Sequence, residues 1–390
     1  MRPKRLLFLF AYALMACVTV GIVAVACTRA TSTPQVLQPE PAATKAGPIA
    51  ATSTLGGTSG ATTAPTAPPP AAGTAAAPSA AASSNPFGLL MAINSPAQQK
   101  LLQVLGVGYF RTVNALNIER WDGTCQQCDL ALEMGVKLLL TVRNNGGGMG
   151  NPTSPPTDLA AYQQVLGEIL DTYPPEVLVV ENEENSSIFY TGTPSDYAIE
   201  LKAACAVAHS KGIKCANGGI VSSLTILLTW EDLMKRGDAN AACDFAKRAF
   251  TIKPQEADVL CNTKSLDSAQ RRVTDQLQKG NELLDVYRAA DTDYMNFHWY
   301  GTDPQALEEA VNFLEQAVGK PVMTNEMGQQ NSADPNVIAP MLQKAYDLGL
   351  SYIVWYSVDA PQAKALQDEN GTLRPNGEAF RQFMQAFNSR

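Results

Sequence analysis

The chain has 390 residues, of which 45% are hydrophobic and 17% are charged, and it carries a formal net charge of −8. These fractions are typical of a globular protein and exclude a chain that is disordered throughout. The negative charge argues against nucleic acid as a partner, because an acidic surface repels phosphate backbones.

Residues 1–27 resemble an export signal. A basic start, residues 1–5, precedes an apolar run over residues 6–26. Small residues then lead to Cys27, as in bacterial lipoprotein signals, where that cysteine becomes the lipidated first residue. An apolar run of about 20 residues can also span a bilayer, so a membrane anchor is the alternative. Both interpretations place the rest of the chain outside the cytoplasm and tethered to the membrane.

Residues 28–85 are rich in alanine, threonine, proline, serine and glycine. Such a segment has too few large apolar side chains to form a core, which predicts a disordered and partly extended linker. The folded domain is therefore expected over residues 86–390.

Within this domain, short apolar segments alternate with helical patterns. Eight segments are predicted to be strands: 87–93, 106–113, 136–142, 177–180, 213–217, 294–300, 321–326 and 352–358. Eight strand-then-helix units are typical of a (β/α)8 TIM barrel of the α/β class. The alternative is an open doubly wound sheet, but no glycine-rich phosphate loop follows the first strand. Residues 218–292, between strands five and six, predict a helical insertion over the mouth of the barrel.

Six cysteines lie in the domain, and an even number in an exported protein usually forms disulfides. Pairing of neighbours along the chain predicts three bridges: Cys125–Cys128, Cys205–Cys215 and Cys243–Cys261. The first pair also has the CxxC spacing of redox and zinc motifs. No second CxxC is present, so a structural bridge is favoured.

Two of the predicted strands end in carboxylates. The apolar run Val177–Val180 is typical of a strand buried on both faces, and Glu-Asn-Glu-Glu follows it at residues 181–184. The seventh strand ends in Glu326. Barrel enzymes place their chemistry at these strand ends. We therefore predict that Glu183 and Glu326 are an acid and a base, or an acid and a nucleophile. Glu181 and Glu184 are expected to be solvated or to lie behind the site.

Other strand ends supply amides, guanidinium groups and aromatic rings. The candidates are Arg111, Asn114, Arg143, Asn182, Asn217, His298, Tyr300 and Trp355. The set lacks a Ser-His pair, a phosphate cradle and, with only two histidines in the chain, a plausible metal cluster. It suits a neutral polyhydroxylated ligand, meaning a sugar. Neither a metal nor another cofactor is expected.

Two motifs resemble those of a known group of enzymes. Asn182-Glu183 and Lys320-Pro-Val-Met-Thr-Asn-Glu326 are similar to motifs of clan GH-A, the cellulase- and xylosidase-like retaining glycoside hydrolases with catalytic glutamates on strands four and seven. Arg111, His298-Trp299-Tyr300 and Trp355 also fall at matching strand ends. The resemblance covers about residues 86–390. One departure is Glu184, where the clan often has proline.

The resemblance implies a role for each group. Glu183 would be the acid/base, and Glu326 the nucleophile, kept ionised by Arg111 and Tyr300. Asn182 would bond the 2-hydroxyl of the sugar, and His298 would belong to the same set. Trp299 or Trp355 would offer a flat face to a pyranose ring.

These observations predict an exported, surface-tethered retaining glycoside hydrolase that cleaves β-glycosidic bonds in a polysaccharide or oligosaccharide by double displacement. The alternative is a glycan-binding barrel at the cell surface without catalytic activity. The expected partners are a carbohydrate and the membrane, with no nucleic acid, and the protein is expected to be a monomer.

Overall fold

The computed structural model describes residues 85–147, 150–251, 253–329, 333–358, 365–368 and 370–390. The predicted signal or anchor with Cys27 lies outside the described residues, as does the predicted linker up to residue 84. No helix within the described ranges combines the length and apolarity needed to cross a bilayer.

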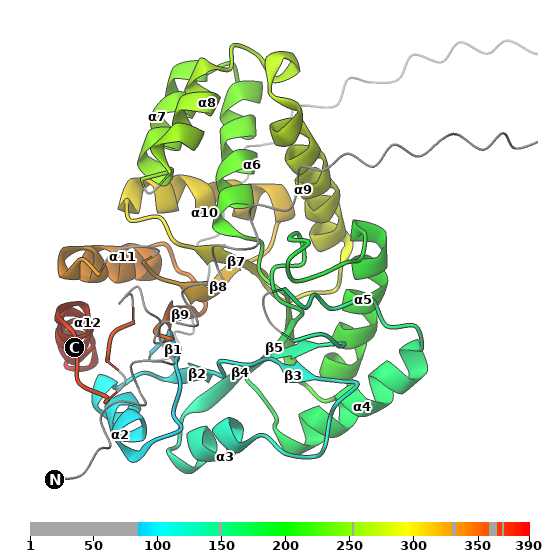
Figure 1. Cartoon of the computed structure of the whole chain (residues 1–390), viewed down its shortest axis with the longest axis vertical. Coiled ribbons are helices and arrows are strands. Elements are labelled where there is room, and N and C mark those ends of the chain that lie inside the picture. Colours follow the sequence, from blue (N-terminus) through cyan, green and yellow to red (C-terminus); the bar gives the residue numbers. More distant parts are fainter. Residues whose placement is uncertain (1–84, 148–149, 252, 330–332, 359–364, 369) are drawn as a thin grey trace, which may run out of the picture. The chain divides into compact units, whose positions relative to one another are not determined.

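Parallel strands form a barrel surrounded by helices (Figure 1). In chain order the barrel strands are β1 (Phe87–Leu90), β2 (Tyr109–Arg111), β4 (Lys137–Arg143), β5 (Val177–Val180), β6 (Lys214–Asn217), β7 (Met295–Trp299), β8 (Val322–Met327) and β9 (Ile353–Tyr356). They are hydrogen-bonded in the order β6-β5-β4-β2-β1-β9-β8-β7. Isolated bridges, Ala216 to Tyr294 and Ile220 to Phe297, join the two ends of this sheet. The predicted (β/α)8 barrel is confirmed.

The short strand β3 (Leu116–Asn117) pairs with the end of β4 outside the main strand order. Some strands are also shorter than predicted. The second was expected over residues 106–113, but Gly106 ends the preceding helix with a left-handed φ of 63°. This conformation suits glycine at a helix end, and it delays the strand.

The outer helices begin with recognisable capping signals. They are α2 (Pro96–Leu105), α3 (Gln126–Glu133), α4 (Leu159–Thr172), α5 (Pro194–Ser210), α10 (Pro304–Val318), α11 (Pro335–Asp347) and α12 (Pro375–Asn388). Ser95 and Thr193 form capping boxes, and each is followed by a proline at the first turn. These side chains satisfy backbone N–H groups that have no partner within the helix, and proline there has none to satisfy.

The alternation of side chains along each strand creates two core layers. In β5, Val177 and Val179 point into the barrel, whereas Leu178 and Val180 pack in the outer core with the helices. The inner cluster also contains Leu90, Tyr109, Leu139, Ala216, Met323, Tyr352 and Val354. The barrel interior is therefore filled, and a ligand must bind at its carboxyl end.

A helical lobe lies between β6 and β7, as predicted. It consists of α6 (Ser222–Lys235), α7 (Ala239–Ala249), α8 (Pro254–Asn262), a 3-10 turn (Leu266–Ser268) and α9 (Arg271–Ala289). The lobe has its own buried side chains, including Trp230 and Phe245. At Gly280, a Cβ would lie 2.9 Å from Leu224, so glycine allows α9 to pack closely on α6.

All three predicted disulfides are present. Cys125–Cys128 lies at the start of α3, Cys205–Cys215 joins α5 to β6, and Cys243–Cys261 joins α7 to α8. Each bridge closes a short loop and limits the freedom of the unfolded chain, which stabilises the fold.

Candidate active site

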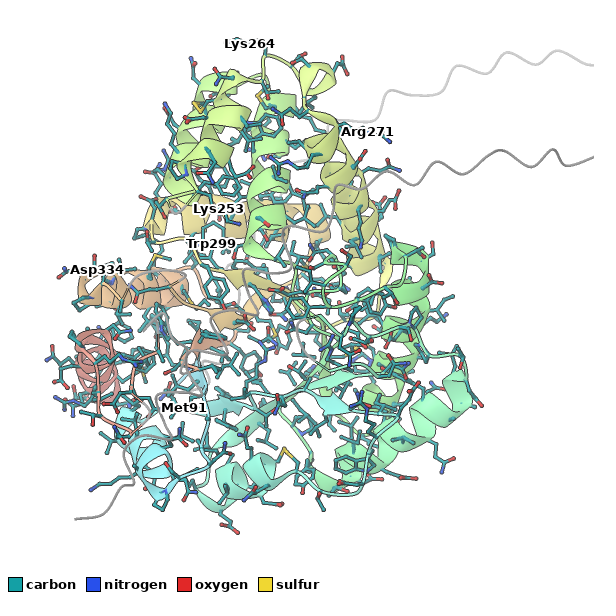
Figure 2. The ribbon with its side chains drawn as sticks, viewed as in Figure 1. Met91, Lys253, Lys264, Arg271, Trp299 and Asp334 are labelled. Carbon is teal, nitrogen blue, oxygen red and sulfur yellow. A yellow bond between two sulfur atoms is a disulfide. The ribbon has the colours of Figure 1, made fainter. Side chains whose placement is uncertain are left out.

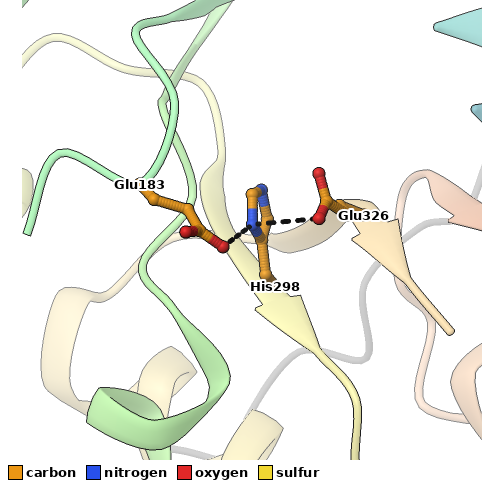
Figure 3. A group of neighbouring side chains, drawn as sticks. All are labelled: Glu183, His298 and Glu326. Atoms are coloured by element: carbon orange, nitrogen blue, oxygen red, sulfur yellow. Dashed lines mark hydrogen bonds and ion pairs between the residues drawn. The ribbon is translucent and has the colours of Figure 1, made fainter. Parts of the chain in front are cut away.

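Glu183 and Glu326 meet at the carboxyl end of the barrel, with His298 between them (Figure 3). Glu183 follows β5, the fourth barrel strand, and Glu326 lies on β8, the seventh. One carboxylate oxygen of each glutamate lies within 4.8 Å of the other. Nδ1 of His298 is 2.9 Å from Oε1 of Glu183 and 3.9 Å from Oε1 of Glu326. The strand positions predicted for the two carboxylates therefore bring them into one site.

Both oxygens of Glu326 accept hydrogen bonds. Nη1 of Arg111 donates to Oε2 at 2.8 Å, and the hydroxyl of Tyr300 donates to Oε1 at 2.6 Å. Burial alone would raise the pKa of this carboxyl. The positive charges of His298 and Arg111 and the two hydrogen bonds outweigh burial and hold the pKa of Glu326 below its ordinary value. Glu326 is therefore ionised at neutral pH.

Arg111 fixes several strand ends at once. Its side chain is buried, and besides Glu326 it donates to the backbone oxygen of Asn325 at 2.9 Å and to Oδ1 of Asn182 at 2.6 Å. A planar guanidinium suits this task because its N–H groups diverge in a rigid fork. The amide nitrogen of Asn182 has no partner among the described residues and is available to donate to a ligand.

His298 is fully buried and bonded through both ring nitrogens. Nε2 lies 3.0 Å from Oδ1 of Asn325, an oxygen that also accepts from the amide of Asn296 at 2.9 Å. Nε2 therefore donates. Burial alone would lower the pKa of His298, but the charge of Glu326 and the bond and charge of Glu183 raise it above its ordinary value. His298 thus hydrogen-bonds Glu183 through Nδ1 and Asn325 through Nε2.

The backbone at the end of β5 separates neighbouring side chains. Glu181 and Glu183 have φ angles of 68° and 50°, in the left-handed region that non-glycine residues rarely adopt. This turn brings Glu183 to the cleft and directs Glu181 and Glu184 under the barrel end. Strain of this kind is typical of functional sites.

Glu181 and Glu184 are buried, so the expectation that they lie behind the site is correct and the alternative, solvation, is wrong. Oε1 of Glu181 accepts from Thr153 Oγ1 at 2.9 Å, and burial raises the pKa of Glu181 to about 7. Glu184 accepts from the hydroxyl of Tyr287, and burial raises its pKa as well. Hydrogen bonds to buried partners keep both side chains out of the cleft.

A cavity of about 600 Å³ covers the carboxylate pair. Among the residues that line it are Arg111, Asn114, Arg143, Asn182, Glu183, Phe189, Tyr300, Glu326 and Tyr356. A second cavity, of about 330 Å³, shares Glu183, Phe189 and Tyr300 with the first and extends toward the lobe. Both volumes fall within the range of small-molecule sites.

The two predicted tryptophans do not reach either cavity. Trp299 and Trp355 are buried in the outer core, with ring centroids 6.2 Å from Phe297 and 6.3 Å from Phe380. His298 faces inward, so its neighbour Trp299 must face the helices, and the same alternation directs Trp355 outward. The prediction of a tryptophan platform is therefore wrong.

Tyr300, Tyr356 and Phe189 supply aromatic surface in the cavity instead. The guanidinium of Arg143 lies 5.8 Å from the ring centre of Phe189, and its Nη2 donates to the backbone oxygen of Phe189 at 2.6 Å. Arg143 therefore both lines the cavity and fixes the loop that carries Phe189. Sequence reasoning missed Phe189, because it lies in a loop with no strand-end signal.

Some residues lie below the cavity. Asn217 is buried and bonded to Glu184 and to the backbone of Asn296, so it supports the site without lining it. Asn296 and Asn325 were not predicted, although Asn325 directly precedes Glu326 and Asn296 lies two residues before His298 on β7. At Gly219, φ is 92° and a Cβ would lie 2.5 Å from Nε2 of His298, so only glycine fits there.

Glu183, His298 and Glu326 have the composition of a metal site, with one ligand atom each within 4.8 Å. The guanidinium of Arg111 contacts the carboxylate of Glu326, and the positive charge of Arg111 repels a cation. Both oxygens of Glu326 also already accept hydrogen bonds. The electrostatics therefore favour proton transfer and nucleophilic chemistry over metal binding at this site.

No family profile and no curated protein sequence matches the chain. Among solved structures, it resembles a GH128 (subgroup II) endo-β-1,3-glucanase from Sorangium cellulosum at 17% identity and a TM-score of 0.47, over 76% of this chain and 97% of that one. It also resembles a GH128 (subgroup I) endo-β-1,3-glucanase from Amycolatopsis mediterranei, at 11% identity and a TM-score of 0.47, over 76% of this chain and 99% of that one. A third similar structure is a GH128 (subgroup VII) oligosaccharide-binding protein from Trichoderma gamsii, at 12% identity and a TM-score of 0.43, over 78% of this chain and 96% of that one. Similarity at this level concerns the arrangement of strands and helices and assigns no residue.

Proposed function

We propose that residues 86–390 form a retaining glycoside hydrolase that cleaves β-glycosidic bonds in a polysaccharide or oligosaccharide. The observation that carries this proposal is the pair Glu183 and Glu326, with carboxylate oxygens within 4.8 Å of each other in one cleft. Retaining enzymes place the two carboxyls about 5–5.5 Å apart, whereas inverting enzymes need about 6.5–9.5 Å to admit a water. The short separation supports double displacement.

The different surroundings of the two carboxyls support different roles. Glu326 is held ionised and attacks the anomeric carbon as Glu183 gives its proton to the departing oxygen. The sugar is then bound to Glu326 through an ester. Glu183 next takes a proton from water, the water oxygen attacks the same carbon, and Glu326 leaves as a carboxylate. Two inversions at one carbon give net retention.

His298 and Asn182 assist these steps. Nδ1 of His298 hydrogen-bonds Glu183 at 2.9 Å. This bond orients the carboxyl group that gives a proton in the first step and takes one in the second. The free amide of Asn182 is positioned to donate to a hydroxyl of the sugar next to the anomeric carbon. The aromatic surface of Tyr356 and Phe189 suits the apolar face of a pyranose.

We also propose that the protein is exported and tethered at the cell surface as a monomer. The three disulfides support an oxidising compartment, in which such bridges persist. If Cys27 is lipidated, mass spectrometry of the mature N-terminus will find acyl chains on it, and Cys27→Ser will release the protein from membranes. An unmodified Cys27 in membrane-bound protein would favour the anchor. Light scattering of the purified domain tests the monomer.

The test of the main proposal is hydrolysis across a panel of aryl β-glycosides and plant and microbial polysaccharides. Release of reducing sugar is expected, and NMR of the first-formed product should show the β anomer. An α anomer would contradict double displacement. Binding without turnover across the panel would favour a glycan-binding barrel instead.

A further inference from the structure

The second cavity, of about 330 Å³, lies on the lobe side of the carboxylate pair, and we call it the lobe-side chamber. Its lining includes Glu183 and Tyr300 but not Glu326. The lobe contributes Ser222, Ser223, Ile226, Ala249, Phe250 and Lys253. This asymmetry between the two cavities carries the inference.

The proposed mechanism predicts which part of the substrate lies in each of the two cavities. The nucleophile lies against the anomeric carbon of the sugar that stays on the enzyme, so that sugar occupies the cavity holding both glutamates. The acid lies against the oxygen of the departing sugar. A chamber that contains the acid but not the nucleophile therefore lies where the leaving group emerges.

The lobe wall of the chamber is fixed to the barrel. Oγ of Ser222 donates to the backbone oxygen of His298 at 3.1 Å and accepts from the backbone nitrogen of Tyr300 at 3.0 Å. Nη2 of Arg248, near the end of α7, lies 2.6 Å from Glu309 of α10. These contacts hold the start of α6 beside the end of β7, and the end of α7 beside α10.

Phe250 and Lys253 come from the short connection between α7 and α8, which the Cys243–Cys261 disulfide holds together. The backbone nitrogen of Lys253 donates to the backbone oxygen of Phe250 at 3.1 Å, which closes a tight turn. Lys253 is exposed and lines the chamber, and no salt bridge joins it to the described residues, so its ammonium group can donate to a ligand. An aromatic ring beside a free donor suits a pyranose, which has an apolar face and a rim of hydroxyls.

We propose that the lobe-side chamber binds the leaving-group sugar, as a neutral pyranose unit that contacts Phe250, accepts a hydrogen bond from Lys253 and donates to or accepts from the hydroxyl of Ser223. Apart from Glu183 and Lys253, the lining consists of uncharged side chains, which suit a neutral ligand. The lobe thereby selects chains with a sugar beyond the cleaved bond. This inference rests on the proposed function.

The test compares two leaving groups on one glycone. The substrates are β-fluorides of glucose and xylose, in which the leaving fluoride is too small to fill the chamber, and β-1,3- and β-1,4-linked oligosaccharides of the same sugars. The measured quantity is the ratio of kcat/KM for the oligosaccharide to kcat/KM for the fluoride. Lys253→Met should lower this ratio roughly 10-fold, the effect of one lost hydrogen bond to a substrate hydroxyl. Phe250→Ala should lower it further.

The matched control is Lys264→Met, an exposed lysine at the far end of the lobe (Figure 2). It should leave the ratio unchanged. Because Phe250 is largely buried and its removal disturbs the lobe, the exposed Lys253 keeps the test decisive. If the parent protein is active but the ratio is unchanged in Lys253→Met and Phe250→Ala, the proposal that the lobe-side chamber binds the leaving-group sugar is wrong, and the proposed function is unaffected. A parent protein that cleaves neither these substrates nor any glycoside of the broader panel would overturn the proposed function, and this inference with it.

Discussion

Two groups of glutamates around the end of β5 have opposite environments. Glu183 and Glu326 face the large cavity, and the second is surrounded by positive charge and donors. Glu181, Glu184 and Glu200 are buried beneath the barrel end, where burial raises the pKa of each. In the cleft, positive charge and hydrogen-bond donors favour the ionised form of Glu326. In the buried set, burial favours the protonated form of each carboxyl.

The comparison shows that the sign of the local charge, rather than burial, distinguishes the groups. Glu326 is largely enclosed, with 12% of its side chain exposed, yet Arg111, His298 and Tyr300 favour its charged form. Glu200 accepts from the hydroxyl of Tyr190 at 2.9 Å and lies beside Glu181, whose negative charge adds to burial in raising the pKa of Glu200. A carboxylate that must attack carbon needs the first environment.

The largest expected effect is the loss of the nucleophile. Glu326→Gln should lower turnover by roughly 10⁴-fold or more, because an amide cannot form the glycosyl-enzyme ester. Steady-state kinetics and circular dichroism should show an inactive but folded protein. The matched control is Glu184→Gln, in the buried set, which should keep most of its activity. Near-normal activity in Glu326→Gln would remove Glu326 from the mechanism.

Removal of the acid/base should affect the two chemical steps differently. Glu183→Ala should slow hydrolysis of natural glycosides by several orders of magnitude, whereas an activated aryl glycoside still forms the ester, since its leaving group needs little protonation. Added azide needs no deprotonation and should restore turnover, giving a β-glycosyl azide. Azide rescue of Glu184→Ala in place of Glu183→Ala would exchange the roles of the cleft and buried groups. An α-glycosyl azide would point to direct attack on the intact substrate.

The hydroxyl of Tyr300 helps to keep Glu326 ionised. Tyr300→Phe removes a donor to Oε1, so the pKa of Glu326 should rise and the acidic limb of the kcat/KM profile should move to higher pH. A fall in kcat/KM of about 10-fold is expected for the loss of one charge-assisted hydrogen bond. Tyr294→Phe, at the opposite end of β7, is the control and should leave the limb in place. An acidic limb that moves to lower pH in Tyr300→Phe would contradict the assignment.

The smallest expected effect concerns stability in the buried set. The folded-state pKa of Glu181 is raised from 4.5 to about 7, so between these pH values the folded protein binds a proton that the unfolded chain has released. Stability should therefore fall as pH rises through this window. Glu181→Gln should remove part of this slope and raise stability at pH 8 by on the order of 1 kcal/mol, since one pKa unit corresponds to about 1.4 kcal/mol.

Urea unfolding of both proteins at pH 5 and pH 8 measures this effect. Glu133→Gln, at an exposed position on α3, is the control and should follow the parent protein. The contribution of the cleft carboxylate Glu326 to stability depends on pH in the opposite direction. The pKa of Glu326 is lowered, so its contribution is present above pH 4.5 and is lost as the pH falls below that value. A Glu181→Gln variant that is less stable than the parent at pH 8 would show that the ionised carboxylate is well compensated by Arg143.

Local patterns in the sequence were sufficient for much of the architecture. The apolar runs and capping residues predict the barrel strands and helices, because period-2 and period-3.6 patterns depend only on neighbouring residues. The three disulfides join cysteines that are close along the chain, so proximity in sequence was enough to pair them. The placement of Glu183 and Glu326 at one edge follows from the parallel direction of the strands.

Only the tertiary structure decided which side chains of these segments face the ligand. Side chains alternate in an extended strand, yet two left-handed residues after β5 change which of Glu181, Glu183 and Glu184 enters the cleft. The sequence places tryptophans near the carboxyl ends of β7 and β9, but alternation buries Trp299 and Trp355 while a loop and the lobe supply Phe189 and Phe250. Those contacts join segments far apart in the chain, and packing of the whole domain, rather than local preference, determines them.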